Sequence, residues 1–208
     1  MKAFALTFLI LLAAPLQALA EQVIFSEVHY NPSGDTPEFI EIFNNTSTPF
    51  DFGLWRLTDG VDYTFPDFNE GDPSAVILKH FERIIVTSAT EAAFRAAYPG
   101  TPAATRIFGP WTGSLNNNGE RIALEDKNGV LMVALTYGDD GKWPVSPDGA
   151  GHTLVIKDPF KLTDDWRNWK ASGAKDGTPG SAPAGDSGIS IENPEIDLAS
   201  TTPYIDLG

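Results

Sequence analysis

The sequence predicts an all-β fold, an antiparallel β-sandwich with one short helix. Many short runs alternate apolar and polar residues, which is the period of a strand with one buried face. Turns rich in Gly, Pro, Asn and Asp separate these runs. Only residues 88–100 combine helix-forming residues with recognisable start and stop signals. Many short strands joined by polar turns are typical of a sandwich.

The first 20 residues predict a signal peptide that precedes this fold. Lys2 gives a positive start, AFALTFLILLAAPL gives an apolar stretch, and ALA at 18–20 matches the small-x-small cleavage rule. The apolar stretch is too short and wrongly flanked for a membrane-spanning helix. We therefore expect cleavage before Glu21, no membrane span after cleavage, and a secreted protein in the periplasm or the medium.

The alternating runs define the predicted strands and core. Residues that share one face of a run are Ile40, Ile42, Trp55, Leu57, Ile122, Leu124, Leu131, Val133, Leu135, Tyr137, Leu154 and Ile156. We expect Trp55 and Leu57 to fill the space between the two sheets. Asn128-Gly129 lies between two runs, which is a strong hairpin signal. The polar stretch 44–49 reads as a turn.

The predicted helix lies in SATEAAFRAAYPG, residues 88–100. Ser88 stands three residues before Glu91, which is the spacing of a capping box. Ala-rich helix formers follow, and Pro99-Gly100 ends the run. This length suits a crossover at the end of a sheet.

We expect a signal peptide at 1–20, one sandwich domain at 21–183 and an acidic tail at 184–208. From about Ser181 the composition changes to Pro, Gly, Ser and Ala, and after Lys175 six acids and no base follow. ISIENPEIDL, residues 189–198, keeps enough alternation to be an added edge strand. A mature chain of this length buries enough surface to fold without disulfides, which fits the lack of Cys.

The chain resembles the lamin tail domain family, in its secreted bacterial form, from about Val23 to Gly180. The resemblance is carried by SEVHYNPSGDTPEFIEIFNNT (26–46), GLWRLTDGVDYTFP (53–66), FRAAYPG (94–100), GPWTGSLNNNGERIALEDKNGV (109–130), LTYGDDGKWPVSPDGAGHTL (135–154), DPFKLTDDWRNWKAS (158–172) and GTPG (177–180). It implies an immunoglobulin-like sandwich and an adaptor module, in bacteria often joined to larger secreted enzymes or surface proteins. One departure is LKHFERIIV (78–86), where bacterial members usually turn on Pro and Gly.

Catalytic and metal-binding motifs are missing from the sequence. There is no Cys, and His29, His80 and His152 stand alone, so a zinc site is not expected. Neither G-x-S-x-G nor a phosphate-binding loop occurs. We therefore predict no catalytic, cofactor-binding or metal-binding residue and no enzyme activity.

Carboxylates are the remaining candidates for chemistry. Pairs that suggest a Ca²⁺ site are Asp59 with Asp62, Asp67 with Asp72, Asp139 with Asp140, and Asp164 with Asp165. Each pair is more typical of a turn with solvated acids than of a cation site. Glu27, Glu38 and Glu41 suggest a carboxylate pair across neighbouring strands, but a paired-carboxylate hydrolase also needs a cleft.

Five Trp residues raise a carbohydrate-binding alternative. We expect Trp55, Trp143 and Trp169 to be buried, and Trp111 and Trp166 to be the residues that could stack on a sugar. The excess of 28 acids over 14 bases argues against binding to a phosphate backbone, so no nucleic-acid partner is expected.

These observations predict a secreted, non-catalytic interaction module whose partner is an unknown protein or a surface glycan. The alternatives are a calcium- or glycan-dependent adhesion module and an accessory domain of a secreted hydrolase or nuclease.

Overall fold

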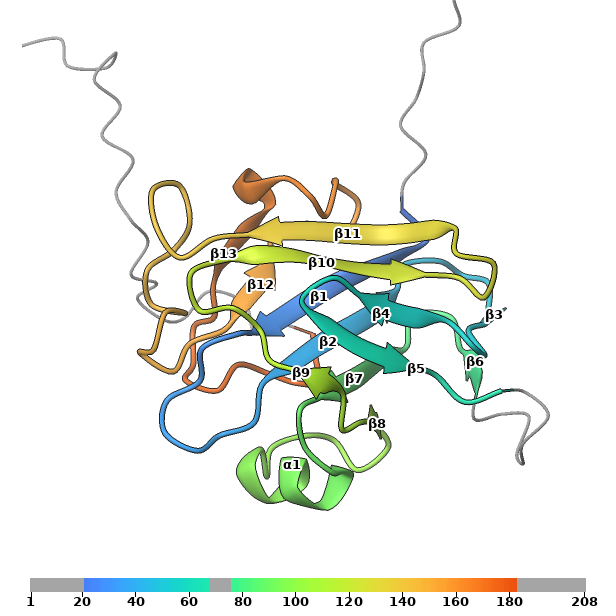
Figure 1. The fold of residues 1–208 in the computed structure, drawn as a ribbon, viewed down its shortest axis with the longest axis horizontal. Coiled ribbons are helices and arrows are strands. Elements are labelled where there is room, and N and C mark those ends of the chain that lie inside the picture. Colours follow the sequence, from blue (N-terminus) through green and yellow to red (C-terminus); the bar gives the residue numbers. More distant parts are fainter. Residues whose placement is uncertain (1–20, 68–75, 183–208) are drawn as a thin grey trace, which may run out of the picture.

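The computed structural model describes residues 21–67 and 76–182. It is a β-sandwich, as Figure 1 shows. One six-stranded sheet has the order β13-β12-β1-β2-β7-β8, and a five-stranded sheet faces it in the order β11-β10-β4-β5-β9. A third pair joins β3 to β6. The predicted signal peptide and acidic tail lie outside the described residues, as does Asp72.

The strands are short, as the alternating runs predict. The first sheet comprises β1 (Val23–His29), β2 (Phe39–Asn44), β7 (Arg83–Thr87), β8 (Arg106–Phe108), β12 (Leu154–Ile156) and β13 (Trp169–Ala171). The second comprises β4 (Arg56–Thr58), β5 (Val61–Thr64), β9 (Thr112–Gly113), β10 (Glu120–Glu125) and β11 (Leu131–Tyr137). The small pair comprises β3 (Phe50–Asp51) and β6 (Ile77–Leu78).

One pairing departs from the predicted antiparallel pattern. β8 runs parallel to β7, and the helix α1 (Glu91–Ala97) lies in the connection between them. A parallel pair needs a crossover rather than a tight hairpin, so the helix takes the crossover position that its length predicts. In contrast, β10 and β11 form the predicted hairpin across Asn128-Gly129.

The start of the helix differs from the predicted capping box. Thr90 is the N-cap, and its side chain accepts a hydrogen bond from Ala93 N. The Ser88 hydroxyl instead accepts from the backbone N–H of Glu38, 3.1 Å away. Ser88 is thus used to join the end of β7 to the start of β2, and the helix begins two residues later.

The two sheets enclose one main apolar core. Trp55 and Leu57 are buried in it, which confirms the expectation drawn from the alternating run. Trp55 also stacks on Phe50, with ring centroids 5.3 Å apart and planes tilted by 14°. Trp169 is buried and donates its ring N–H to Thr163 O, whereas Trp143 is only partly buried against the core.

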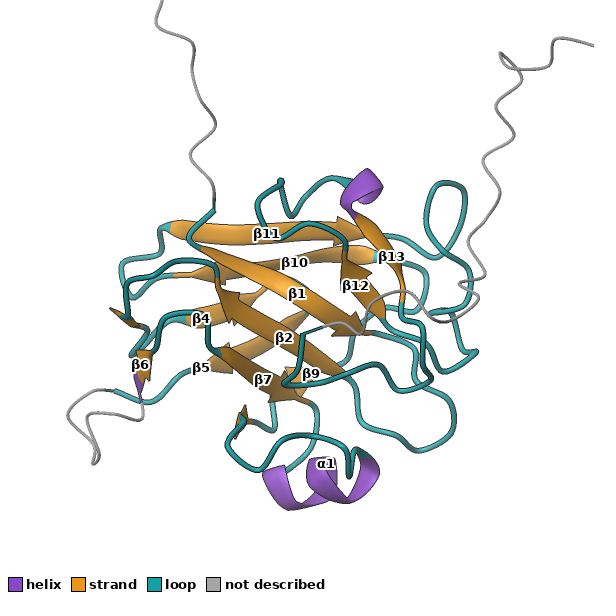
Figure 2. Ribbon diagram, turned by 180° about the vertical axis from the view of Figure 1, so that it is seen from behind, coloured by secondary structure: helices purple, strands orange, loops and turns teal. Residues whose placement is uncertain are grey.

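β1 and β2 are buried on both faces. Their inner face packs into the main core. The segment that follows β13 crosses in front of the outer face of the sheet (Figure 2). Phe39 packs there with Phe94 and Tyr98 of the helical region in a second apolar cluster. This cover explains why a strand that alternates in sequence is buried at every position.

Candidate functional site

Two carboxylates face each other across β1 and β2. Glu27 pairs with Glu41 in the strand register, and each residue is 1% exposed. The sequence suggested Glu27, Glu38 and Glu41 as candidates for such a pair, and the structure brings Glu27 and Glu41 together. Glu38 lies apart from the pair and accepts a hydrogen bond from the backbone N–H of Leu115 at 3.2 Å.

Glu27 is held by donors that come from distant parts of the chain. Its Oε1 accepts from the Thr153 hydroxyl at 2.6 Å and from the backbone N–H of Thr178 at 3.0 Å. Thr153 immediately precedes β12, the neighbour of β1, while Thr178 lies on the segment that crosses the outer face of the sheet. The carboxylate therefore links three parts of the chain.

Glu41 is the charged partner of the pair. Its Oε1 accepts from the Ser26 hydroxyl at 2.5 Å and forms an ion pair with Arg83 Nε at 3.1 Å. Its Oε2 accepts from the backbone N–H of Gly180 at 2.7 Å. The guanidinium of Arg83 lies over the Phe43 ring, 4.0 Å from the centroid. The positive charge of Arg83 thus pairs with Glu41 and also stabilises a negative charge on Glu27.

Burial and mutual repulsion set the protonation of the pair. Burial raises the pKa of Glu27, and the charge of Glu41 raises it further. Burial also raises the pKa of Glu41, while Arg83 lowers it. Ionising both buried carboxyl groups beside a single counter-cation carries a large free-energy cost. Glu27 is therefore the protonated member of the pair, and Glu41 carries the negative charge that pairs with Arg83.

The segment that covers the pair depends on two glycines. Gly177 has φ +66° and Gly180 has φ +82°, a conformation that residues with a side chain rarely adopt. A Cβ at Gly177 would overlap Glu27 Oε1, and a Cβ at Gly180 would overlap the Thr105 hydroxyl. The backbone can approach the carboxylates only because both positions lack a side chain.

A cavity of about 320 Å³ lies beside this segment. It is lined by the C-terminal end of the helical region, including Tyr98, and by residues 175–179 and Ser181. Glu27 does not line it, because the backbone of Gly177 and Thr178 lies over the carboxylate. The acid pair is therefore closed to substrate, and its oxygens are used to hold the C-terminal segment.

His29 is buried beside the pair and not in a catalytic arrangement. Its Nδ1 lies 2.9 Å from the Tyr98 hydroxyl, and its ring meets Phe39 edge to face. Burial lowers the pKa of His29 to about 4, with a further contribution from His152. His152 Nδ1 contacts Ser172 O at 2.8 Å. His29 and His152, which stand alone in the sequence, therefore lie close enough in the fold for their charges to interact.

The Asp pairs are used in turns and surface ion pairs. Asp59 pairs with Arg121, and Asp62 pairs with Arg56 at 3.5 Å. Asp164 Oδ1 accepts from Thr136 N at 2.7 Å, across the edge of β11. No group of three or more His, Asp or Glu side chains is placed to hold a metal ion within residues 21–67 and 76–182.

The two Trp residues considered for sugar binding do not form a platform. Trp111 is buried, with 6% of its surface exposed. Trp166 is partly exposed, but Lys142 and Arg167 lie over its ring at 5.4 and 4.9 Å. Trp111 immediately precedes β9 and Trp166 lies in the helical turn η2 (Trp166–Asn168) before β13, elements that are far apart in both views (Figures 1 and 2).

The described residues form an immunoglobulin-like sandwich. Its acid pair is enclosed and holds segments of the chain together. The family model of the lamin tail domain matches residues 17–139. Because this match covers more than half of the chain, the protein belongs to the lamin tail domain family, a non-catalytic immunoglobulin-like domain family. A comparison with curated proteins finds no match. No helix within the described residues is long and apolar enough to cross a membrane.

The C-terminal segment is the part of the site that sequence reasoning missed. GTPG at 177–180 was visible as a block, but its position over Glu27 and Glu41 was not predicted. The usable signal was Gly177 and Gly180, with Thr178 and Pro179 between them, because closely spaced glycines indicate a backbone that approaches another group closely.

Proposed function

We propose that this protein is a secreted lamin-tail-domain protein that acts as a non-catalytic interaction or adaptor module. The signal-peptide pattern of residues 1–20 supports secretion. Family membership supports a sandwich that acts through binding. The single observation that carries the proposal is that Glu27 and Glu41, the acids best placed for chemistry, are closed off and used to hold the C-terminal segment.

The first test is a search for turnover. The purified protein is assayed against nuclease, esterase, glycosidase and protease substrates, with and without Ca²⁺ and Mg²⁺. We expect no turnover in any assay. Turnover that is lost in Glu41→Gln, but not in the exposed control Glu91→Gln, would contradict the proposal if both variants remain folded.

The second test is binding. Immobilised protein is exposed to envelope and culture-fluid fractions of the source organism, and each captured protein is then titrated in purified form. We expect a saturable partner. A glycan array probed with the same protein tests the glycan alternative. We expect no glycan binding, because neither Trp111 nor Trp166 supplies the stacking face that such binding needs.

A further inference from the structure

The large apolar side chains exposed on the described residues are unevenly distributed. These residues are Leu54, Phe81, Val130, Leu131, Val145, Phe160 and Leu162. All except Val145 lie on loops or strand ends that the strand pairing brings to the same end of the sandwich. We call this the apolar end and define it as residues 45–54, 79–82, 126–131 and 157–163.

The strand register places these segments together. β1 and β7 begin, and β2 ends, at this end of the first sheet, because Val23 and Arg83 pair with Asn44 and Phe43. In the second sheet, β4 and β11 begin where β10 ends at Glu125. Figure 1 shows β3, β6 and the β10–β11 hairpin together at the right.

Direct contacts join the segments of the apolar end. Asn45 Nδ2 donates to Pro159 O, and Phe81 N donates to Thr46 O. Phe50 stacks on Trp55, next to Leu54. Residues 45–54 therefore contact both 79–82 and 157–163, and the β10–β11 hairpin lies at the same end of the sandwich (Figure 1).

Two of these exposed residues have an unfavourable backbone conformation. Leu54 has φ +60° and Phe81 has φ +54°. A bulky residue with positive φ is a genuine outlier, and Gly would adopt this conformation without cost. Phe81 is 54% exposed, so the strain is not offset by full burial. Such strain concentrates at functional positions.

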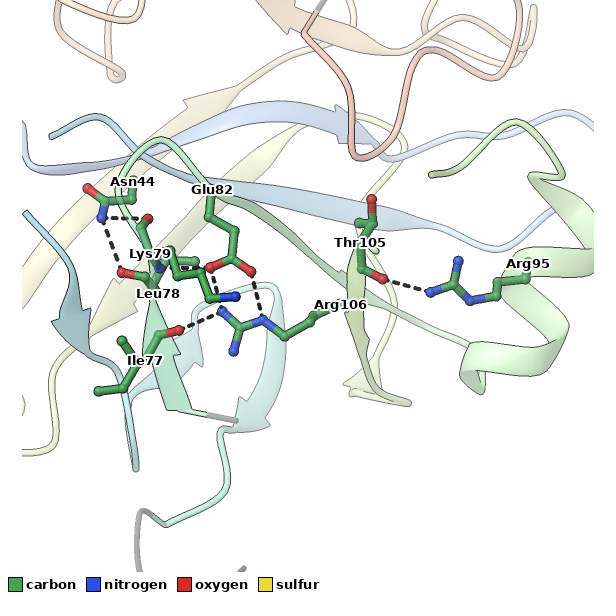
Figure 3. Close-up of polar contacts among 8 residues, drawn as sticks. All are labelled: Asn44, Ile77, Leu78, Lys79, Glu82, Arg95, Thr105 and Arg106. Atoms are coloured by element: carbon green, nitrogen blue, oxygen red, sulfur yellow. Dashed lines mark hydrogen bonds and ion pairs between the residues drawn. The ribbon is translucent and has the colours of Figure 1, made fainter. Parts of the chain in front are cut away.

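The turn that carries Phe81 is held rigidly (Figure 3). Asn44 Nδ2 donates to the carbonyls of Leu78 and Lys79 at 3.3 and 2.9 Å. Glu82 accepts from Lys79 N at 2.7 Å and pairs with Arg106 through two nitrogens at 2.9 Å. A loop whose backbone is already ordered loses little entropy on binding, so the turn is preorganised for contact.

The charge of the apolar end differs from that of the whole chain. Its four acids are Asp51, Glu82, Asp126 and Asp158, and its four Lys are Lys79, Lys127, Lys157 and Lys161. Each acid accepts a backbone hydrogen bond within its own loop. Lys79, Lys127 and Lys157 are exposed and form no ion pair with another described residue. The surface thus combines apolar side chains with exposed ammonium groups, while its acids accept backbone hydrogen bonds within their own loops.

We propose that the apolar end docks a partner polypeptide whose contact surface presents apolar side chains among carboxylates. The interaction role itself rests on the proposed function; the surface and the chemistry of the partner are new. A second copy of the chain fits less well, because it would present the same Lys side chains and no surplus of carboxylates.

The test uses short random peptides displayed on phage and selected on the purified protein. We expect enriched peptides that contain aromatic or aliphatic residues together with Asp or Glu. Synthetic copies are titrated against the protein and its variants by fluorescence polarisation. Phe81→Gly and Phe160→Ser should each weaken binding by at least about tenfold, and Lys127→Glu should weaken it in a salt-dependent way. Val145→Ser, an exposed apolar position outside the apolar end, is the matched control and should leave binding unchanged.

Phe81→Gly separates a binding role from a structural one. Gly relieves the positive φ, so the melting temperature of this variant should not fall although its binding does. A lower melting temperature with unchanged peptide binding would overturn the proposal.

Three other results would also overturn it: enrichment of basic peptides or of none, sedimentation as a dimer that Phe160→Ser disrupts, or binding to vesicles of phosphatidylcholine and phosphatidylglycerol. Peptides that bind equally to all variants would refute the apolar end as the surface and leave the interaction function standing. Enzymatic turnover would refute the proposed function without changing peptide binding.

Discussion

Replacing Glu27 by Gln should reduce the pH dependence of stability between pH 6.5 and 8. Burial and the neighbouring Glu41 raise the pKa of Glu27 from 4.5 to about 8 in the folded protein. The folded state therefore keeps a proton that the unfolded state has released, and the free energy of unfolding falls as the pH rises through this interval. His29 opposes this only below about pH 6.5, because its pKa is lowered from 6.5 to about 4 by burial.

The magnitude follows from one proton over this interval. One pH unit corresponds to about 1.36 kcal/mol for each proton, so the wild-type protein should lose about 2 kcal/mol between pH 6.5 and 8. Gln at position 27 retains an oxygen that can accept from Thr178 N but has no proton to lose. Burial also raises the pKa values of Glu41 and Glu38 to about 7, so the variant should keep a smaller fall in stability, confined to the lower part of the interval.

Urea denaturation at several pH values in this interval measures the effect. Glu91→Gln is the control, because Glu91 is exposed and forms only a surface ion pair with Arg95. The reasoning is refuted if wild-type stability is constant or rises from pH 6.5 to 8. It is also refuted if Glu27→Gln shows the same fall as the wild type.

Three further substitutions test the packing. Gly177→Ala should cost about 2–4 kcal/mol, since it combines a left-handed backbone with overlap on Glu27; Gly129→Ala, with positive φ but open space, should cost less than half of this in the same denaturant melts. Trp55→Ala should cost about 3–5 kcal/mol, and a loss below about 1 kcal/mol would mean that the buried position is wrong. Thr90→Ala should cost about 1 kcal/mol through the lost N-cap, measured by thermal unfolding, and no loss would show that the cap is dispensable.

The fold could be predicted because its strands carry local signals. The alternating run that contains Trp55 and Leu57 needs no distant information, since one buried face fixes the period. Asn128-Gly129 likewise fixes a hairpin by its own backbone preference. These features depend on neighbours in sequence, and the structure confirms them.

The burial of Glu27 and Glu41 could not be predicted in the same way. Alternation places Glu41 on the face opposite Ile40 and Ile42, where a polar residue indicates solvent. That face is covered by a segment whose donors lie 151 and 139 residues away. Docking at such a separation leaves no trace in the periodicity of the strand, so a pair that looked like accessible carboxylates is a buried structural contact.

The first residue of the helix also could not be predicted from local sequence alone. Ser88 and Thr90 are both acceptable N-caps by composition. The residue that precedes β2 decides between them, because the backbone N–H of Glu38 donates a hydrogen bond to the Ser88 hydroxyl. A tertiary contact thus selects one of two equivalent local signals.

The boundary of the folding unit gives a last prediction. The family match ends at residue 139, but Glu27 and Glu41 need the backbone N–H groups of Thr178 and Gly180. A chain that ends at Ala184 should melt within a few degrees of the mature protein, whereas one that ends at Asp176 leaves two buried carboxylates without these donors. A hydrogen bond contributes about 0.5–1.5 kcal/mol, or about 1.5–3 kcal/mol when one group is charged, so the shorter chain, which lacks both bonds, should lose about 2–5 kcal/mol or fail to fold. Differential scanning calorimetry on the two chains decides the question. If the chain ending at Asp176 matches the longer one, the C-terminal segment is not part of the fold, and the acid pair must be satisfied without it.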